Sequence, residues 1–339
     1  MVISMKLHAT REEIDQVCER VRDFGYKIHS IEGEERVVIG VVGVGDVTAC
    51  LESVEAMPQV EKAVRISAPY KFVSREFRPE KTQIKVDGQE IGGDVFIMMA
   101  GPCSVENEKQ IMQTAEEVAA AGAHLLRGGA FKPRSSPYSF QGLGEQGLEI
   151  LSAAAKRHGL TVVTEIMSEH DVDLVGRFTG IFQIGARNMQ NFALLKAIGE
   201  TRRPVLLKRS MMGTIEELLL SAEYIMKGGN PHVILCERGI RTFETQTRNT
   251  LDIAAVPVIK RLSHLPILVD PSHAMGDWHY VAPASMAALA AGADGIIVEI
   301  HPDPAKALSD GKQTLTHEHF EQMMKRLRDL APHLGVQVR

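Results

Sequence analysis

The chain has 339 residues, which is too long for one small domain and fits a barrel of about 250 residues with a module of about 70. Hydrophobic residues make up 44% and charged residues 24%, a balance that excludes a largely disordered chain. The 38 basic and 43 acidic residues give a net charge of −5, which argues against general binding to nucleic acid or to an anionic membrane.

Residues 1–67 alternate between strand-like and helix-like patterns. Strands are predicted at 2–7, 26–33, 36–43 and 60–67, and helices at 11–24 and 48–57. In the first helix, Ile14, Val17, Val21 and Phe24 recur at helical spacing. The order of these elements predicts a ferredoxin-like βαββαβ domain.

Residues 68–82 carry two prolines, many charges and no clear period, so we predict a linker that lies over the surface. A short hairpin over 83–92, turning at Asp87-Gly88, is expected to open a second domain, 83–339, and could close the bottom of it.

From residue 95 onward, eight apolar strand-like runs alternate with amphipathic segments. The runs are 95–101, 124–130, 161–166, 180–186, 204–209, 232–238, 265–271 and 295–302. The clearest helix candidates are 109–122, 148–159, 214–229 and 282–292, each ending on Gly as a C-terminal cap does. Eight such units favour a closed (β/α)8 TIM barrel, an α/β fold, over an open doubly wound sheet.

Reactive side chains stand at the end of almost every predicted strand, where such barrels place their active sites. They are Cys103, Arg127 with Lys132, Glu165, Arg187, Lys208 with Arg209, Glu237 with Arg238, Asp270 with His273, and Glu299 with His301. A barrel of purely structural role has no need of this ring.

The cations of this ring, with Arg134, should converge on one mouth. Because like charges repel, they must be neutralised by carboxylates or bind an anionic ligand, and two phosphates and a carboxylate would suit them. The set is Arg127, Lys132, Arg134, Arg187, Lys208, Arg209 and Arg238. Any single member could instead be a salt-bridged rim residue.

Cys103, His273, Glu299 and Asp310 follow the first, seventh and eighth predicted strands. Thiolate, imidazole and carboxylate ligands suit a divalent ion of the Mn, Fe, Zn or Cu class better than Mg or Ca. The alternative is that Cys103 only packs and His273 only stabilises a loop, and spacing leaves this open because the residues are not local.

Two motif matches carry no function. Gly142 to Gly147 fits the dinucleotide-binding pattern G-x-G-x-x-G, but it follows a loop and not an apolar strand. Asp270, Ser272 and His273 are residue types of a catalytic triad, but neighbours this close rarely assemble one.

Seven segments together resemble the 3-deoxy-D-arabino-heptulosonate 7-phosphate (DAHP) synthases of the type I-beta group, over essentially the whole barrel. They are GPCSVE (101–106), LRGGAFKPRSSPYSFQG (126–142), IGARNMQNF (184–192), LLKR (206–209), ILCERGIRTF (234–243), LVDPSHA (268–274) and IVEIHPDPAKALSDGKQ (297–313). Residues 1–67 and YKFVSREFRPE resemble the subgroup whose ferredoxin-like extension mediates feedback inhibition by aromatic amino acids.

The resemblance implies a metal-dependent condensation of phosphoenolpyruvate with erythrose 4-phosphate. It assigns the metal to Cys103, His273, Glu299 and Asp310, phosphoenolpyruvate to Arg127, Lys132, Arg187, Lys208 and Arg238, and erythrose 4-phosphate to Lys132, Pro133, Arg134, Ser135 and Ser136. Lys132, as proton donor to the new alkoxide, Glu165, as a group that positions water, and His273 are the catalytic candidates.

The sequence leaves two alternative functions. A 3-deoxy-D-manno-octulosonate 8-phosphate (KDO8P) synthase, which takes arabinose 5-phosphate, typically has an Asn-Arg-Ser-Ser type segment where this chain has Pro133. Ser135 replaces the Thr of the commoner DAHP synthase motif and keeps its hydroxyl. A non-catalytic sensor of anions or amino acids would be favoured if a metal or phosphate position were replaced, and none is.

His29 and Ser30, polar residues of the second predicted strand, are the candidate effector site between two such modules. The alternative role of this domain is oligomerisation alone, and a homodimer or homotetramer is expected. The scattered cysteines form no disulfide framework, and the sequence shows neither a leader peptide nor a run of about 18 apolar residues. We therefore expect a cytoplasmic protein with neither membrane nor nucleic acid as a partner.

Overall fold

The structure, a computed structural model, describes residues 1–32, 37–43, 46–65, 68–132 and 138–338, with the side chains of 29–32 left out. Its contacts divide the chain into two compact units, Met1–Glu80 and Lys81–Arg339.

The first unit is an antiparallel sheet with two helices. Its strands are β1 (Val2–Met5), β2 (Lys27–Glu32), β3 (Val37–Val42) and β4 (Val60–Val64), in the order β2-β3-β1-β4, and its helices are α1 (Arg11–Asp23) and α2 (Val47–Glu55). A capping box between Thr10 and Glu13 starts α1, which buries Ile14, Val17 and Val21 as their spacing predicted. The βαββαβ ferredoxin-like prediction is confirmed.

The predicted linker, residues 68–82, contains no helix or strand, but it buries several apolar side chains. Tyr70, Phe72, Val73 and Phe77 are buried, and the rings of Phe72 and Phe77 meet edge to face with centroids 5.3 Å apart. Charges and prolines mark a segment without regular structure, but the apolar side chains between them still gain free energy by leaving water.

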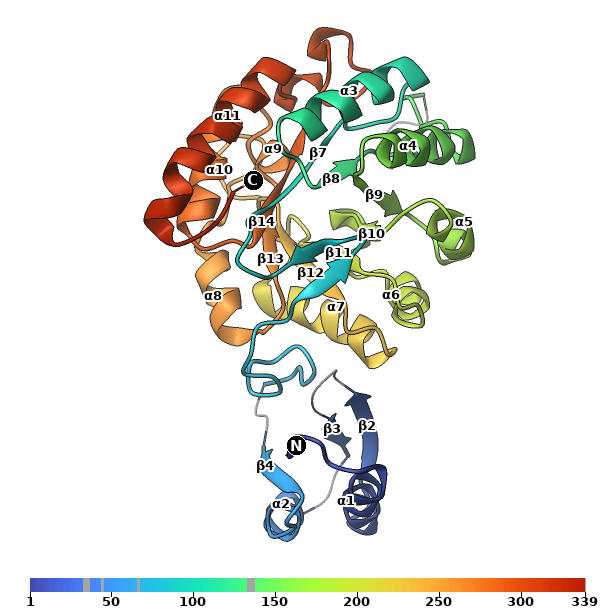
Figure 1. Cartoon of the computed structure of the whole chain (residues 1–339), viewed down its shortest axis with the longest axis vertical. Helices are drawn as coiled ribbons and strands as arrows, with labels where there is room; N and C mark the ends of the chain where they lie inside the picture. The colour runs from blue at the N-terminus through green and yellow to red at the C-terminus, as the bar shows by residue number, and fades with distance from the viewer. Residues whose placement is uncertain (33–36, 44–45, 66–67, 133–137, 339) are drawn as a thin grey trace. The chain divides into compact units, whose positions relative to one another are not determined.

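The second unit is a closed barrel of eight parallel strands inside a ring of helices (Figure 1). The strands are β7 (Ile97–Gly101), β8 (Leu125–Arg127), β9 (Thr161–Ile166), β10 (Ile181–Ile184), β11 (Val205–Lys208), β12 (Val233–Glu237), β13 (Ile267–Val269) and β14 (Gly295–Glu299). The α-helices are α3 (Glu108–Ala120), α4 (Glu145–Arg157), α5 (Val172–Gly176), α6 (Phe192–Gly199), α7 (Ile215–Lys227), α8 (Ala255–Leu262), α9 (Pro271–Met275), α10 (Val281–Ala290) and α11 (His317–Leu330). The predicted TIM barrel is confirmed.

A hairpin of β5 (Ile84–Val86) and β6 (Gln89–Ile91) precedes the barrel. Its turn residues Asp87 and Gly88 both have positive φ, as a tight two-residue hairpin loop requires. Ile84 and Ile91 are fully buried in one apolar cluster with residues that begin barrel strands, including Ile97, Leu125 and Ile181. The hairpin therefore closes the bottom of the barrel and leaves the other end for a site.

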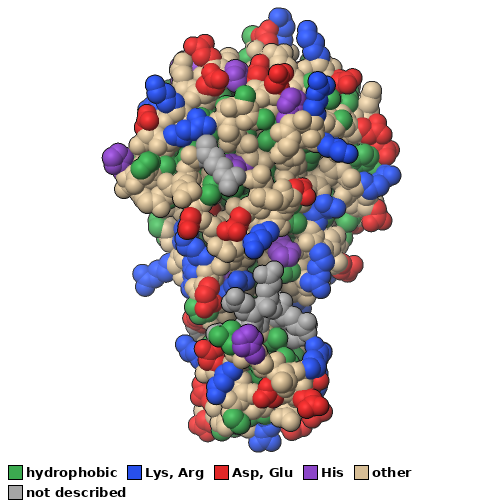
Figure 2. All heavy atoms as spheres, in the orientation of Figure 1, with side chains coloured by type: hydrophobic (Ala, Val, Ile, Leu, Met, Phe, Trp, Pro, Cys, Tyr) green, Lys and Arg blue, Asp and Glu red, His purple; other side chains and the backbone are tan. Residues whose placement is uncertain are grey.

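On the surface, Lys and Arg side chains alternate with Asp and Glu over the face drawn in Figure 2, in keeping with the small net charge. Among the described residues, none of the helices combines the length and apolar character that a bilayer crossing requires.

Candidate active site

A cavity of about 410 Å³ opens at the C-terminal ends of the barrel strands. Cationic side chains dominate its wall, although the whole chain is slightly acidic. The ionisable lining residues are Arg127, Lys132, Glu165, Arg187, Lys208, Arg238, Arg241, Arg248, His273 and Asp310. Eight of these ten are predicted site residues, so the structure brings most of the ring together.

Two buried guanidinium groups in this wall have N–H groups that no described residue accepts. They are Nε of Arg127 and Nη1 of Arg238, whose side chains are 4% and 6% exposed as whole residues. Burial also lowers the pKa of Arg238, which shows that nearby carboxylates do not fully compensate its charge. Buried donors of this kind require an acceptor, and an anionic ligand in the cavity would supply one.

Buried Lys208 and Asp270 form a chain of polar contacts with partly buried His273 beside the cavity. Asp270 caps the N-terminus of α9: its side chain accepts a bond from the His273 backbone at 2.9 Å and pairs with both Lys208 and Nδ1 of His273. Burial alone would raise the pKa of Asp270, but His273 and Lys208 hold it well below its usual value. Burial lowers the pKa of His273, which favours a neutral ring with its proton on Nδ1.

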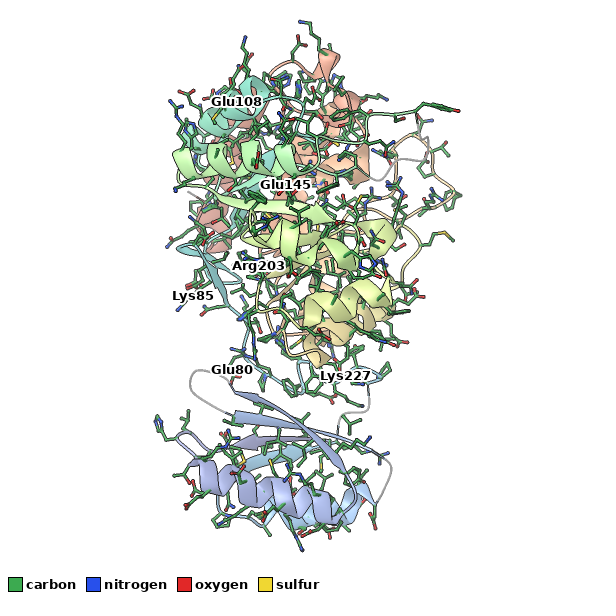
Figure 3. All side chains as sticks on the ribbon, turned by 90° about the vertical axis from the view of Figure 1, so that its right-hand side faces the viewer. Glu80, Lys85, Glu108, Glu145, Arg203 and Lys227 are labelled. Atoms are coloured by element: carbon green, nitrogen blue, oxygen red, sulfur yellow. The ribbon has the colours of Figure 1, made fainter. Side chains whose placement is uncertain are left out.

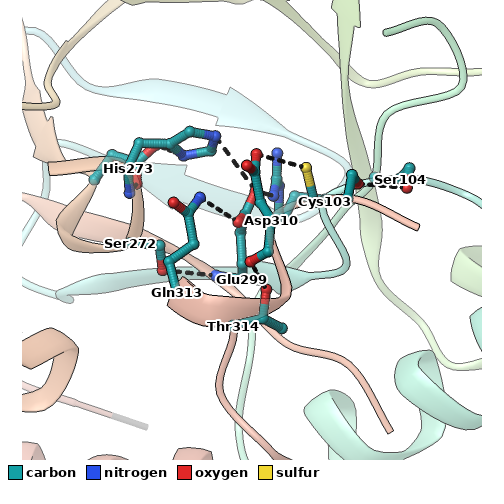
Figure 4. A network of polar contacts seen from close by, with 12 residues as sticks. Cys103, Ser104, Ser272, His273, Glu299, Asp310, Gln313 and Thr314 are labelled. Carbon is teal, nitrogen blue, oxygen red and sulfur yellow. Dashed lines mark hydrogen bonds and ion pairs between the residues drawn. The ribbon is translucent and has the colours of Figure 1, made fainter. Parts of the chain in front are cut away.

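The predicted metal ligands gather at the edge of this cavity (Figure 4). Donor atoms of Cys103, Glu299 and Asp310 all lie within 4.8 Å of one another. Sγ of Cys103 is 3.3 Å from Oδ2 of Asp310, and Nε2 of His273 is 3.3 Å from Oε1 of Glu299. A neutral His273 with its proton on Nδ1 turns a lone pair toward the Glu299 carboxylate, so a cation between them would relieve the repulsion.

The protonation of this set also fits a metal site. Burial, with Glu299 nearby, raises the pKa of the Cys103 thiol to about 12, so the thiol holds its proton until a cation displaces it. Burial opposes the charge of Glu299, yet His273 in its protonated form and Arg127 lower its pKa to about 2. Thiolate, imidazole and two carboxylates are donors suited to a borderline divalent transition ion.

Gln313 and Arg248 orient the two carboxylates of this set. Gln313 donates to Oε2 of Glu299 at 2.6 Å and accepts from Arg248 at 2.7 Å, while Arg248 reaches Oδ1 of Asp310 at 3.3 Å. Arg127 donates to Oε1 of Glu299 at 2.6 Å. Both oxygens of Glu299 are therefore fixed in direction.

Glu165 lines the cavity from β9, beside Gln183 of the neighbouring β10. Gly185 leaves the space that its carboxylate fills, because a Cβ at Gly185 would collide with Oε1 of Glu165. Lys132, from the loop after β8, bonds to the carbonyl oxygen of Cys103 at 2.9 Å and to its Sγ at 3.1 Å.

Some predicted members of the ring lie elsewhere. Arg209 does not line the cavity: it pairs with Glu237 at 2.9 Å and with Asp252 at 2.8 Å, so it is a buried structural cation. Arg209 therefore does not belong to the predicted set of ligand-binding cations. The same ion pair accounts for Glu237, a charged residue at the end of β12 that also does not line the cavity. His301 is 3.4 Å from Glu106, also outside the cavity lining.

Other predicted residues fall outside what the structure describes. Pro133, Arg134, Ser135 and Ser136 lie outside the described residues. The backbones of His29 and Ser30 pair in β2 with Gly40 and Ile39 of β3, and their side chains are not described.

Sequence reasoning missed Arg241, Arg248 and Asn249, which line the cavity from the loop between β12 and α8. The length of that loop is the available signal, because long irregular loops in compact domains are usually functional. Gln183 and Gln313 were also missed, since an uncharged amide on or near an apolar strand resembles any core polar residue.

Comparison with known proteins covers the whole chain. The model of the DAHP synthetase I family matches residues 79–334, and that of the DAHP synthase ferredoxin-like domain matches residues 1–68. A phospho-2-dehydro-3-deoxyheptonate aldolase of Thermotoga maritima is 53% identical over 338 residues, 100% of each chain. A 2-dehydro-3-deoxyphosphooctonate aldolase of Syntrophobacter fumaroxidans is 30% identical over 73% of this chain and 91% of its own.

Solved structures give the same relation. The crystal structure of a DAHP synthase from Thermotoga maritima, 52% identical, superposes with a TM-score of 0.80 over 100% of this chain and 99% of the other. A truncated form of the Thermotoga maritima enzyme, 54% identical, covers 79% of this chain and 98% of its own, with a TM-score of 0.74.

Proposed function

This chain belongs to the DAHP synthetase I family, and from that membership we infer that it condenses phosphoenolpyruvate with erythrose 4-phosphate. The products are DAHP and phosphate, and the reaction is the first step of the shikimate pathway to aromatic amino acids. The observation that carries the inference is the set of buried, incompletely bonded guanidinium groups beside a thiol and carboxylate cluster.

The cationic wall supports binding of two phosphorylated anions. Arg127, Lys208 and Arg238 lie deep in the cavity and are proposed to hold the phosphate and carboxylate of phosphoenolpyruvate, together with Lys132 and the exposed Arg187. Residues 132–136 are proposed to contact erythrose 4-phosphate.

A divalent ion of the Mn, Fe, Zn or Cu class is proposed to bind Cys103, His273, Glu299 and Asp310, which the chemistry of this donor set supports. When bound, such an ion acts as a Lewis acid toward the aldehyde oxygen of erythrose 4-phosphate.

The remaining chemistry falls to the chain's own residues. C3 of phosphoenolpyruvate forms a bond to the aldehyde carbon, which turns the aldehyde oxygen into an alkoxide. Lys132, whose ammonium lies beside Cys103, donates a proton to this alkoxide. The new C–C bond leaves a positive charge at C2, and a water molecule positioned by Glu165 adds there and releases one proton. The C2–O bond to phosphate then breaks, and the remaining hydroxyl proton leaves with the phosphate to give the ketone. The cations lining the cavity stabilise charge throughout, the largest contribution expected from the protein.

A KDO8P synthase would share this chemistry but take arabinose 5-phosphate. The 53% identity to a phospho-2-dehydro-3-deoxyheptonate aldolase over both full chains favours erythrose 4-phosphate over the 30% identity to the octonate enzyme. The assay is loss of phosphoenolpyruvate absorbance with each sugar phosphate, before and after chelation. Turnover with arabinose 5-phosphate alone would contradict the substrate, and full activity after thorough chelation would contradict the metal.

Feedback inhibition through the ferredoxin-like domain is also proposed, with an aromatic amino acid as effector and His29 and Ser30 at its site. The match of residues 1–68 to the DAHP synthase ferredoxin-like domain supports a regulatory role. Adding Tyr, Phe or Trp to the same assay should lower the rate for at least one of them. No inhibition by any of the three would contradict the proposal.

A homodimer or homotetramer and a cytoplasmic location stay predictions. Light scattering on the purified chain would give the oligomeric state, and a monomer at all concentrations would contradict the predicted homodimer or homotetramer.

A further inference from the structure

Two of the proposed metal ligands stand on different loops of the barrel. Cys103 follows β7, the first barrel strand, and Asp310 lies in the loop after β14, the last. These strands pair side by side, and the N–H of Ile300 donates to the carbonyl of Gly101 at 2.9 Å. The distance between the two ligands therefore depends on how these two loops are joined beyond the strand ends.

Three side-chain contacts join the loops outside the cavity. The hydroxyls of Ser104, labelled beside Cys103 in Figure 4, and Ser309 are 2.7 Å apart. Oε1 of Glu106 accepts from the N–H of Leu308 at 2.8 Å, and Oε2 lies 3.4 Å from Nε2 of His301. Each contact involves a neighbour of a proposed ligand and not the ligand itself.

The direction of the His301 bond follows from its other nitrogen. Nδ1 of His301 accepts from the N–H of Asp303 at 3.0 Å, so a neutral ring has its proton on Nε2 and donates to Glu106. On the other loop, Gln110 of α3 accepts from the N–H of Glu106 and donates to the carbonyl of Ser104, both at 3.1 Å. The backbone of Glu106 is thus held in place by Gln110, and its carboxylate faces two donors on the other loop, the N–H of Leu308 and Nε2 of His301.

Asp310 needs such support because its backbone has a φ of 51°, in the left-handed region. This conformation costs a residue with a side chain free energy and persists only where neighbours impose it. Thr314 Oγ1 donates to the Asp310 carbonyl at 2.9 Å. Just before Asp310 in the chain, Leu308 is bonded to Glu106 and Ser309 to Ser104, so these contacts also restrain the Asp310 backbone.

We propose that Glu106, assisted by Ser104 and Ser309, is a positioning residue that holds Asp310 at metal-binding distance from Cys103 and so sets the affinity for the divalent ion. The proposal rests on the metal site of the proposed function. Residues that orient metal ligands from behind typically contribute a factor of about 10–100 in metal affinity.

The test is a Co²⁺ titration of the metal-free full chain, followed by thiolate-to-cobalt absorption, with the dissociation constant obtained by competition with a chelator. Glu106→Ala should raise that constant by about 10–100-fold. Glu106→Gln keeps an acceptor for Leu308 and should recover part of the loss. Glu108→Ala is the matched control, because Glu108 is an exposed carboxylate two residues away on α3 (Figure 3).

The melting temperature of the metal-free variants separates this role from a merely structural one. A structural role alone would lower that temperature and leave the affinity of the folded protein unchanged. Should Glu106→Ala fail to fold, Ser309→Ala, which removes one inter-loop bond, decides by the same titration. Unchanged affinity in the folded variants overturns the proposal alone, whereas no thiolate–cobalt band in the wild-type chain overturns the metal site as well.

Discussion

Lys132 is 7% exposed and has its ammonium group beside the thiol of Cys103, with no carboxylate hydrogen-bonded to it among the described residues. Lys132→Met keeps the apolar stem and removes the proposed proton donor. We expect kcat to fall by about 10²–10⁴-fold, the usual contribution of a general acid. Steady-state kinetics at saturating metal measure it, and a kcat within about threefold of wild type would exclude the role.

Arg209, a buried ion-paired cation, can be compared directly with Arg187, which is proposed to bind ligand. Arg209→Ala leaves Glu237 buried without its partner and should lower the free energy of unfolding by about 3–5 kcal/mol, with KM for phosphoenolpyruvate unchanged in the folded protein. Denaturant unfolding and steady-state kinetics measure the two effects.

Arg187→Ala should give the opposite result, a higher KM and little change in stability, because Arg187 is exposed on the cavity wall. A large rise of KM in Arg209→Ala would return Arg209 to the binding set.

At this scale, charge and strand ends predicted which residues meet, but not how they pair. Arg209 and Arg238 are in the same sequence pattern, each one residue past a barrel strand, yet one has two carboxylate partners and the other has an unbonded N–H. Side-chain direction beyond a strand end depends on loop geometry, which the sequence pattern does not contain.

The β5–β6 hairpin is the element that separates stability from activity most cleanly. Ile91→Ala removes a fully buried side chain at the bottom of the barrel, away from the cavity. We expect a loss of about 2–5 kcal/mol in unfolding free energy with kcat unchanged, measured by denaturant unfolding and the condensation assay. A stable variant with reduced kcat would contradict this, because it would show that the hairpin affects the geometry of the cavity at the opposite end of the barrel.

Among elements, the strongly periodic ones were predictable. The eight strands are short apolar runs, and α1 and α7 begin at capping boxes that the sequence displays as Thr10 with Glu13 and Thr214 with Glu217. Short helices such as α5 and α9 were not predicted, because five residues give too little of a period to detect.

For the whole molecule, the two units should be separable. Thr82 belongs to the barrel, although it was predicted in the linker. Its N–H donates to the His264 carbonyl at 2.8 Å, and its hydroxyl is 2.6 Å from Nδ1 of His264. A cut before Lys81 preserves both bonds. We expect residues 81–339 to fold and catalyse with a similar kcat, while any inhibition by an aromatic amino acid is lost.

Circular dichroism and the condensation assay, run beside the full chain, provide the measurement. The truncated Thermotoga maritima relative, which covers 79% of this chain, supports the expectation that such a barrel folds. Inhibition that survives truncation would place the effector site in the barrel.

At the whole-molecule scale, the number and order of strands predicted both folds, because alternation of elements restricts topology to a few arrangements. The burial of Phe72 and Phe77 within the linker was not predictable, because it is decided by packing and not by local composition.

Cys103 and Asp310 are 207 positions apart in the chain, and they meet only because β14 closes the ring against β7. During synthesis on the ribosome, the site therefore cannot exist until nearly the whole chain has emerged. The proposed cation would bind the native state more tightly than the unfolded chain, and its binding would then shift the equilibrium toward the closed ring. In refolding experiments, cation uptake should lag behind the appearance of helix and mark the moment of ring closure, a contact of high sequence separation that forms slowly.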